Sequence, residues 1–333
     1  MFLMMSAYCS AEELPVSSPV IFEENFDAQP DWSKNASPPA TNECNYPPCS
    51  AAPRNWSAWR AAPWLTPNSP PIAISGAITP DHTSGTGKAL IVQVQSVHSG
   101  SDFASDAMIS KIFPRSYPEL YVRFWLKTQP GWRWDRKNNN VHKIFRVFHY
   151  DGVNNFYKNG PNGSESPLTF FDLATYWVDN SARYFLAYRC SPVRNYHCAG
   201  GGGPDNEISL PFNGKEPSVP GNWADGQWHR YDLHFKINST PARADGKSEF
   251  WYDGKRIVSH NNIKWVTEGS TADAGWNSIS FGGNSNISWG AGDNPTKEQW
   301  YAIDDVVVSS APIPENHAAG GTKGVAAIPA KKR

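Results

Sequence analysis

The segment 225–257 contains two runs in which apolar and polar residues alternate, and this pattern constrains the fold more than any other feature of the chain. In the first run the apolar positions are Tyr231, Leu233, Phe235 and Ile237. A period of two places alternate side chains on opposite faces of a β-strand, so one face is predicted to be buried and the other solvated. The second run ends in the tight-turn sequence Tyr252-Asp253-Gly254-Lys255. We therefore predict two amphipathic strands in an antiparallel β-sandwich, which offers broad faces rather than a deep pocket.

Further strand-like runs follow along the chain. They cover residues 20–26, 88–95, 107–112, 120–127, 142–150, 183–189, 278–282 and 300–309, and a short helix is expected within 168–178. All-β sandwiches often form one unit of about 200–250 residues, so we predict an all-β fold with a single domain at 20–312. The long Pro-, Asn- and Ser-rich loop at 27–80 is expected to be functional or decorative. The tail at 313–333 is expected to be flexible.

The first eleven residues, MFLMMSAYCSA, are apolar and end in small residues, as at the end of a secretory signal peptide. We expect cleavage after residue 11, a leader at 12–19, and a secreted or periplasmic protein. An N-terminus without a targeting role is the alternative. The apolar stretch is too short to span a bilayer, and no membrane span is predicted elsewhere.

Four cysteines would remain after this cleavage, in two closely spaced pairs. In an exported protein Cys44 with Cys49 and Cys190 with Cys198 are predicted to form local disulfides, although four cysteines allow three pairings. A metal site is the alternative, but neither pair has the CxxC spacing typical of zinc ribbons.

Three segments carry a resemblance to a known family: VIFEENFD at 20–27, DGQWHRYDL with FWYDGKRI within 225–257, and YAIDDVVVSSAPIP at 301–314. Together they resemble secreted domains of the concanavalin A-like lectin/glucanase superfamily. The resemblance implies a jelly roll of two antiparallel sheets with long loops, in which a concave sheet binds carbohydrate. It leaves the activity open, because the family includes laminarinase-type glycosidases, polysaccharide lyases of the alginate and glucuronan type, laminin G-like binders and legume-type lectins.

A glycosidase is disfavoured by the missing acid pair. Retaining glycosidases need two carboxyl groups about 5–5.5 Å apart, and the resemblance implies that laminarinase-type members carry them on one strand as Glu-x-Asp-x-x-Glu. The sequence lacks this pattern. Glu23 and Glu24 are adjacent and point to opposite faces, and the same holds for Asp304 and Asp305.

A polysaccharide lyase needs cationic and proton-transferring groups instead. It neutralises the carboxylate of a uronic acid, removes the neighbouring proton and protonates the leaving oxygen. Residues 115–150 contain eight Lys or Arg against Glu119 and Asp135, a local charge of +6 in a chain whose net charge is −1. Clustered positive charge raises the local concentration of an anionic polymer.

One strand in this basic segment has a polar and aromatic face. Tyr121, Arg123, Trp125 and Lys127 share that face, and Val122, Phe124 and Leu126 share the opposite one. We expect the apolar face to join the core and the polar face to form the floor for an acidic sugar chain, with Arg123 catalytic and the others binding substrate. An ordinary solvated face is the alternative. In the following loop, Trp132 and Trp134 are predicted to stack on sugar rings, or else to make cation–π contacts within the loop.

The next strand supplies further candidates. Phe145 and Val147 are predicted to fill the core, which leaves His142, Arg146 and Tyr150 facing the groove. His142 and Arg146 are candidate catalytic residues, and Lys143 and Tyr150 are candidate substrate-binding residues; the alternative for the histidine is a purely structural role.

Two catalytic roles follow from the resemblance. Lyases of this fold carry a Gln-x-His or comparable polar pair on a groove strand, and Gln-x-His is absent here, so His142 or Arg146 would take its place. They also use a late tyrosine as acid and base. Tyr188 is the candidate, with a core tyrosine as the alternative.

The resemblance also implies a structural calcium ion between the first and last strands. Glu24, Asp304 and Asp305 are its candidate ligands, with solvent-facing carboxylates as the alternative. No other cofactor is expected, and no GxSxG, HExxH or P-loop motif is present. The small net charge gives no indication of nucleic-acid binding, and we expect a monomer.

The sequence therefore favours a secreted polysaccharide lyase that cleaves an acidic, uronic-acid-containing polysaccharide by β-elimination. A non-catalytic carbohydrate-binding, lectin-like or adhesion domain that uses the same face is the alternative. A structural surface protein is the third hypothesis.

Overall fold

A computed structural model describes residues 19–34, 44, 47–61, 70–95, 105–132, 141–150, 152, 156, 170–178, 181–189, 225–266, 275–285 and 298–319. Within these residues every regular element is a β-strand, and all strand pairs are antiparallel. The strands form two sheets, so the predicted all-β sandwich is confirmed. No helix in the described part is long and apolar enough to cross a membrane.

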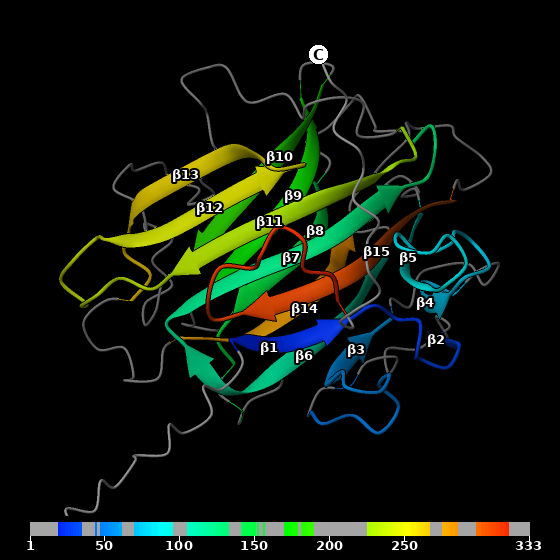
Figure 1. The fold of residues 1–333 in the computed structure, drawn as a ribbon, viewed down its shortest axis with the longest axis horizontal. Helices are drawn as coiled ribbons and strands as arrows, with labels where there is room; N and C mark the ends of the chain where they lie inside the picture. Colours follow the sequence, from blue (N-terminus) through cyan, green and yellow to red (C-terminus); the bar gives the residue numbers. More distant parts are fainter. Residues whose placement is uncertain are drawn as a thin grey trace, which may run out of the picture.

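The larger sheet has nine strands and contains both the first and the last strand of the domain. Its order is β13 (Lys255–Ile263), β12 (Gly246–Tyr252), β11 (Trp228–Lys236), β7 (Glu119–Thr128), β15 (Glu298–Ser309), β5 (Ala89–Gln95), β4 (Ile72–Ser75) and β2 (Trp32–Lys34). The ninth strand, β1 (Val20–Glu24), pairs with β15. Figure 1 shows this sheet in front, with the second sheet behind it.

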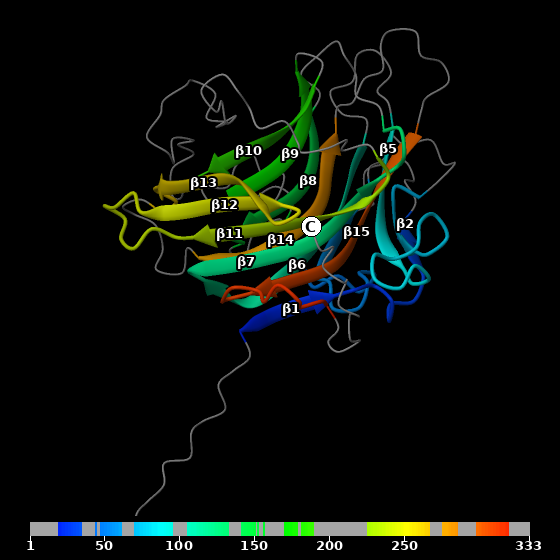
Figure 2. The same cartoon turned by 45° about the horizontal axis from the view of Figure 1, so that its top comes forward.

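The second sheet has six strands. Its order is β10 (Ser181–Arg189), β9 (Phe170–Val178), β8 (Val141–Phe148), β14 (Trp276–Ser285), β6 (Ser105–Tyr117) and β3 (Ala58–Arg60). Figure 2 shows β8, β9 and β14 curving behind the larger sheet. The short helix expected within 168–178 is wrong, because this segment is β9 and pairs with strands on both sides.

The core lies between the two sheets and is rich in aromatic rings. The apolar faces predicted for 120–127 and 231–235 are confirmed, since Val122, Phe124, Leu126, Tyr231, Leu233 and Phe235 are all buried in it. Phe124 on the larger sheet meets Phe145 and Phe281 of the smaller sheet, with ring centroids 5.4 and 5.1 Å apart. These contacts across the sandwich fix which face of each sheet points outward.

The predicted turn between β12 and β13 is also confirmed. Asp253 and Gly254 have φ angles of 48° and 75°. Two successive positive φ angles define a type I′ turn, whose twist matches that of the flanking strands, and Asp-Gly is a preferred sequence for it.

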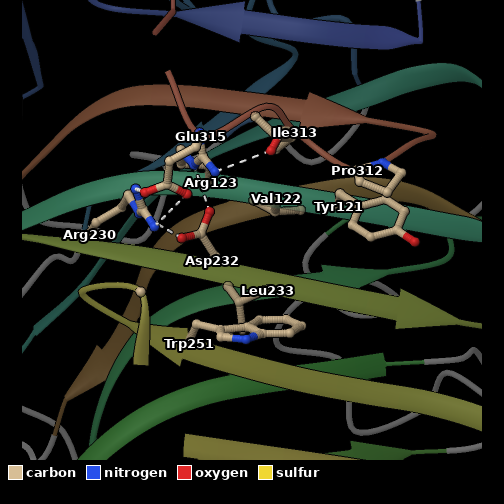
Figure 3. A pocket seen from close by; sticks show the side chains of 11 residues that line it. Tyr121, Val122, Arg123, Arg230, Asp232, Leu233, Trp251, Pro312, Ile313 and Glu315 are labelled. Carbon is tan, nitrogen blue, oxygen red and sulfur yellow. Dashed lines mark hydrogen bonds and ion pairs between the residues drawn. The ribbon is translucent and has the colours of Figure 1, made fainter. Parts of the chain in front are cut away.

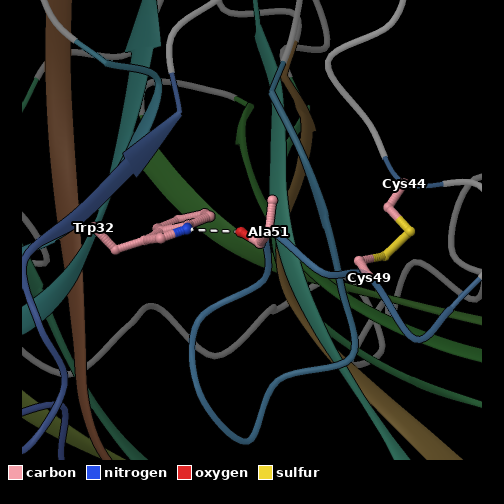
Figure 4. The surroundings of a disulfide bond; sticks show 4 residues. All are labelled: Trp32, Cys44, Cys49 and Ala51. Carbon is pink, nitrogen blue, oxygen red and sulfur yellow. Dashed lines mark hydrogen bonds between the residues drawn. A yellow bond between two sulfur atoms is a disulfide. The ribbon is translucent and has the colours of Figure 1, made fainter.

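One of the two predicted disulfides is present. Cys44 and Cys49 are bonded, as Figure 4 shows, within the long segment that joins β2 to β3. Trp32 Nε1 on β2 donates a hydrogen bond of 2.9 Å to the carbonyl oxygen of Ala51, which ties the same loop to the larger sheet. Cys190 and Cys198 lie outside the described residues, as do residues 1–18, which include the expected signal peptide and all but the last residue of the leader.

The chain after β15 is held against the outside of the larger sheet, so residues 313–319 do not form the flexible tail expected there. We call residues 310–319 the C-terminal strap; it runs across β7 and β15 in Figure 1. Arg123 Nη1 donates to the carbonyl oxygens of Pro314 (2.7 Å) and His317 (3.3 Å). The Ser310 amide donates to Pro19 O, and the His317 ring contacts Glu23. Residues 320–333 lie outside the described part.

Arg123 is therefore predicted to hold the strap in place. In Arg123→Gln the carbonyl contacts and the ion pair with Asp232 are lost, so we expect faster proteolysis within 313–319 and a loss of about 1–3 kcal/mol in the free energy of unfolding. Limited proteolysis with mass spectrometry and urea denaturation measure these effects. Arg256→Gln is the control. Arg256 is mostly exposed, and its Nη1 lies 3.6 Å from Glu249 Oε1, so this ion pair is weak and its loss should leave the strap in place. Unchanged cleavage in Arg123→Gln would contradict this role.

Candidate functional site

The predicted catalytic residues do not meet in one cleft. Arg123 lies on β7 of the nine-stranded sheet, and Arg146 lies on β8 of the six-stranded sheet. Arg123 contacts the strap outside its sheet, whereas Arg146 follows Phe145, which packs in the core between the sheets. The expectation of a single groove built from both strands is therefore wrong, because the two arginines belong to opposite outer faces of the sandwich.

On the nine-stranded sheet, the face of Arg123 is occupied by contacts within the protein. Arg123 is only 5% exposed, and its Nε donates to Asp232 Oδ1 at 2.6 Å. Asp232 stands directly across the strand pair β7–β11. Figure 3 shows the carboxylate of Asp232 between Arg123 and Arg230. The guanidinium of Arg123 is thus neutralised and bonded to the strap, which makes its role structural and not that of a free carboxylate binder.

The aromatic and basic neighbours of Arg123 are also paired. Trp125 stacks on His82 with ring centroids 3.6 Å apart, and Lys127 Nζ lies 5.9 Å from the centroid of Trp228. The outward direction predicted for Tyr121, Arg123, Trp125 and Lys127 is right, because their neighbours Val122, Phe124 and Leu126 are in the core. The face itself is covered by side-chain contacts instead of forming an open floor.

A histidine between two carboxylates lies beside Tyr121. His234 Nε2 contacts Glu119 Oε1 and His234 Nδ1 contacts Glu249 Oε2, both at 2.8 Å. Tyr121 stacks on His234 at 4.2 Å and donates to Glu119 at 3.0 Å. Burial, together with the hydrogen bond to Glu119, raises the pKa of Tyr121 to about 12, so this hydroxyl stays protonated at neutral pH.

On the six-stranded sheet, a β-bulge rearranges the predicted faces of β8. Lys143 pairs with Ala174 and Phe145 pairs with Leu173, so Ile144 is an extra residue between them. Arg146 pairs with Asp172, which lies two residues from Ala174 and therefore on the same side of β9. The bulge consequently brings Lys143 to the side of the sheet that carries Arg146, although strict alternation would separate them.

That side is the outer face. Phe145 and Val147 belong to the core, as predicted, and Arg146 between them points away from it. Arg146 Nη1 donates toward Met108 Sδ at 4.0 Å, and Met108 belongs to a separate cluster outside the core. Arg146 is nonetheless fully buried. A cation removed from water interacts more strongly with any charge that reaches it.

A polar row crosses this outer face at Arg146. Ser280 stands opposite Arg146 on β14, and Ser110 stands opposite Ser280 on β6. The two hydroxyls are 2.5 Å apart, and both serines are fully buried. Gly283 has a φ of 145°, and a Cβ there would lie 2.8 Å from Arg146 Nη2. Glycine at 283 thus leaves the space that the guanidinium occupies.

One end of the same face is apolar. Phe156 packs on Phe148 and Tyr150, with ring centroids 5.7 and 5.0 Å apart, and Ala58 and Met108 complete this cluster. Tyr150 is 6% exposed, on the face predicted for it. We call Ser110, Lys143, Arg146 and Ser280 with this cluster the six-stranded floor. It combines a buried arginine, a partly exposed lysine, hydroxyl groups and aromatic rings on one side of the sheet.

Two further catalytic candidates are described by their backbone alone. His142 pairs with Thr175 and Ser285, one step along the strand from Lys143. Tyr188 pairs with Phe171, which in turn pairs with Val147. The register thus places Tyr188 in the row of Val147 and not in the row of Arg146.

The two loop tryptophans do not form a groove wall in the described part. Trp132 is 5% exposed and lies in the core, 6.4 Å from the ring of Tyr301. Its predicted stacking on sugar rings is therefore corrected, because a core ring offers no free face. Trp134 lies outside the described residues.

The predicted calcium ligands each accept hydrogen bonds from groups of the protein. Glu24 accepts hydrogen bonds from the Phe26 amide and Gln29, whereas Asp304 accepts one from the His82 amide and Asp305 accepts one from Thr83. Among the described residues no group of three or more His, Cys, Asp or Glu is arranged to hold a metal ion. The residues present do not fit the implied site, and we derive no step through a metal.

Asp304 is nevertheless electrostatically unusual. Burial, followed by repulsion from Asp305 and Asp81, raises its pKa to about 9 although two backbone amides donate to it. Because the pKa is higher in the folded than in the unfolded state, Asp304 takes up a proton on folding. Its favourable contribution to stability is therefore complete at low pH and is lost as the pH rises toward about 9.

Several solved structures of polysaccharide lyases are similar to this chain in fold. A double mutant of the alginate lyase Aly36B in complex with alginate tetrasaccharide has a TM-score of 0.49 and 15% identity, over 85% of this chain and 98% of that one. The endo-β-1,4-glucuronan lyase of the fungus Trichoderma reesei has a TM-score of 0.41 and 14% identity, over 72% and 87% of the two chains. The PL-14 alginate lyase of Aplysia kurodai has a TM-score of 0.42 and 14% identity, over 72% and 86%.

These likenesses concern architecture, and no residue role is transferred from them. The structures that the chain resembles include alginate and glucuronan lyases, and also a sialidase and the cellulose induced protein Cip1. No protein-family model and no curated protein sequence matches the chain.

Sequence reasoning missed the serines of the six-stranded floor and the partner of Arg123. Ser278 and Ser280 alternate with Ile279 and Phe281, so period-two analysis of 278–282 would have placed the serines opposite the core. Asp232 stood in the alternating run, but nothing local in the sequence indicates which strand lies next to it.

The carboxylates around His234 are expected to make stability dependent on pH. Burial alone would raise the pKa of Glu119 and Glu249, but hydrogen bonds with His234 lead the effects that hold both below the ordinary value. A carboxylate with a lowered pKa stabilises the fold above its unfolded pKa, and this contribution is lost as the pH falls through the folded pKa. His234→Gln should therefore cost about 1–2 kcal/mol near neutral pH and progressively less below about pH 4.

Urea denaturation across that pH range measures the difference. Lys236→Gln is the matched control, because Lys236 Nζ is 3.9 Å from Glu119 and the side chain is 45% exposed, so it should change stability by less than about 0.5 kcal/mol. A cost for His234→Gln that does not vary with pH would contradict the assignment.

Proposed function

We propose that this chain is a polysaccharide lyase that cleaves an acidic, uronic-acid-containing polysaccharide on the outer face of the six-stranded sheet. One observation carries the proposal: the bulge in β8 puts Lys143 on the same face as the fully buried Arg146. Two cations on one face, next to hydroxyls and aromatic rings, suit a polymer that carries one carboxylate per sugar ring.

The proposed reaction on this face is β-elimination. Abstraction of the proton next to the uronate carboxyl group leaves an electron pair that forms a carbon–carbon double bond, while the glycosidic carbon–oxygen bond breaks and the leaving oxygen takes up a proton. Arg146 is proposed to act from beneath the face, where its positive charge stabilises the negative charge that develops as the proton leaves. Lys143 is the candidate for proton transfer on this face, since the register places His142 and Tyr188 in the rows of the core-facing Phe145 and Val147.

The positive charge of residues 115–150 is not gathered on one face of the protein. Of the eight basic residues in 115–150, Arg123 and Lys127 belong to the other sheet, and Arg123 is already paired with Asp232. The proposal therefore rests on Lys143 and Arg146, and not on the local charge of the segment as a whole.

The Cys44–Cys49 bond supports an oxidising compartment. We propose that the protein acts outside the cytoplasm, in the periplasm or as a secreted monomer.

The activity is tested with alginate, glucuronan and related polyuronates. Cleavage is expected to produce unsaturated uronate ends, which are followed by ultraviolet absorbance and confirmed by mass spectrometry of the products. Lys143→Ala and Arg146→Lys should each lower kcat/KM by about 100-fold or more, because each loses an oriented donor near the reacting carboxylate. Arg146→Lys keeps the buried charge and so limits the effect on folding.

The matched control is Lys247→Ala, a half-buried lysine in β12 of the other sheet. It should leave kcat/KM unchanged. An absence of product from every polyuronate, or equal losses in Lys143→Ala and Lys247→Ala, would contradict the proposal.

Non-catalytic carbohydrate binding is the second candidate. It is favoured by Lys143, which is partly exposed on this face and can bind a carboxylate whether or not proton transfer follows. This function would be supported if immobilised polyuronate retained the protein, no product formed, and Lys143→Ala were no longer retained.

A further inference from the structure

A cavity of about 370 Å³ lies on the outer face of the nine-stranded sheet, on the opposite side of the core from the six-stranded floor. Its base is formed by β7, β11 and β12, and the C-terminal strap forms one wall, as Figure 3 shows. The side chains that matter are Tyr121, Arg230, Asp232, Trp251, Ile313 and Glu315. The volume is within the range of small-molecule sites in proteins.

The charges that line this cavity balance one another. Asp232 accepts hydrogen bonds from Arg123 Nε (2.6 Å) and Arg230 Nε (2.7 Å). Arg230 also donates to both carboxylate oxygens of Glu315, at 2.5 and 3.2 Å. Hydrogen bonding to Arg230 holds the pKa of Glu315 below its ordinary value, so this carboxylate is ionised at neutral pH. Two cations and two anions leave the cavity without net charge.

Trp251 offers the cavity an indole face that packs on no other ring and an indole N–H that donates no hydrogen bond within the described residues. It is half-buried and stands directly across from Asp232 on the strand pair β11–β12. Among the described residues its indole has no ring partner, and its Nε1 makes no hydrogen bond. Other tryptophans on this sheet are engaged: Trp125 stacks on His82, and Trp228 contacts both His82 and Lys127.

An indole face beside balanced charged groups favours a ligand that is both apolar on its faces and rich in hydroxyl groups. A flat indole face packs against the C–H surface of a sugar ring, and a fixed fork of guanidinium and carboxylate groups hydrogen-bonds to neighbouring hydroxyls. A purely apolar ligand would displace water from these charged groups without replacing the hydrogen bonds of that water, at a desolvation cost. An anion such as a phosphate or a uronate gains little, because both guanidinium groups are already neutralised.

We propose that this cavity is a second saccharide site that binds neutral hexopyranose units of a glycan. It is distinct from the six-stranded floor, and it does not depend on the proposed lyase activity. The strap contributes one wall through Ile313 and Glu315, so the site exists only while the strap is docked.

The test is isothermal titration calorimetry of the full chain with neutral oligosaccharides, such as those from cellulose, β-1,3-glucan and mannan. At least one is expected to bind with a Kd of about 1 mM or below, as for a ligand of this size. Trp251→Ala should weaken binding at least tenfold. Glu315→Gln should also weaken it, and because Glu315 is 79% exposed this variant does not threaten the fold.

Two controls separate this site from its neighbours. Trp228→Phe, which changes a tryptophan of the same sheet that does not line the cavity, should bind as the unaltered protein does. Lys143→Ala should also bind normally, even if it abolishes polyuronate cleavage, so failure of the lyase proposal leaves this one standing. Melting curves establish that each variant is folded.

Three outcomes would overturn the inference. They are the absence of saturable binding by every neutral oligosaccharide, equal affinity in folded Trp251→Ala and Glu315→Gln, and tighter binding of an oligouronate than of any neutral oligosaccharide at this site.

Discussion

The direction in which each side chain leaves its strand determines almost everything else in this molecule. Phe124, Phe145 and Phe281 meet between the sheets, and once these rings are in contact the alternate residues of their strands must face outward. Sheets joined by such ring contacts cannot slip by one residue without turning their aromatic side chains into water. The polar chemistry of both outer faces is a consequence of how the core is packed.

A single extra residue shows how sensitive this arrangement is. Period-two analysis put Lys143 with Phe145 and Val147, and it would be correct for a regular strand. The bulge at Ile144 lets two successive residues face the core, so Lys143 changes sides and joins Arg146. Nothing local in the sequence marks this bulge, since Ile144 is β-branched and suits a regular strand. It arises from pairing with β9, which is a property of the sheet.

The sequence therefore predicted the architecture well and the site only in part. Alternation identified the two amphipathic strands, and Asp253-Gly254 identified the turn between them, because both signals are local. The position of Arg123 was predicted correctly on its strand, but its partner Asp232 is supplied by a strand more than a hundred residues later. Arg123 is therefore not free to bind a ligand, because it forms an ion pair with a residue far away in the sequence. Trp132 is not free either, because its ring is buried in the core.

The two outer faces that result have different electrostatic characters. On the nine-stranded sheet the cations have acidic partners close by, as in Arg123 with Asp232, Arg230 with Glu315 and Arg256 with Glu249. Because these charges balance, this face is not expected to attract anions, and neutral ligands can bind to it. The six-stranded floor instead buries Arg146 beside Ser280 on β14 and opposite Asp172 on β9. Since the core separates the faces and no residue contributes to both, substitutions on one should act additively with those on the other. The two sites that we propose therefore share no side chain, so an acidic and a neutral saccharide would not compete for the same groups.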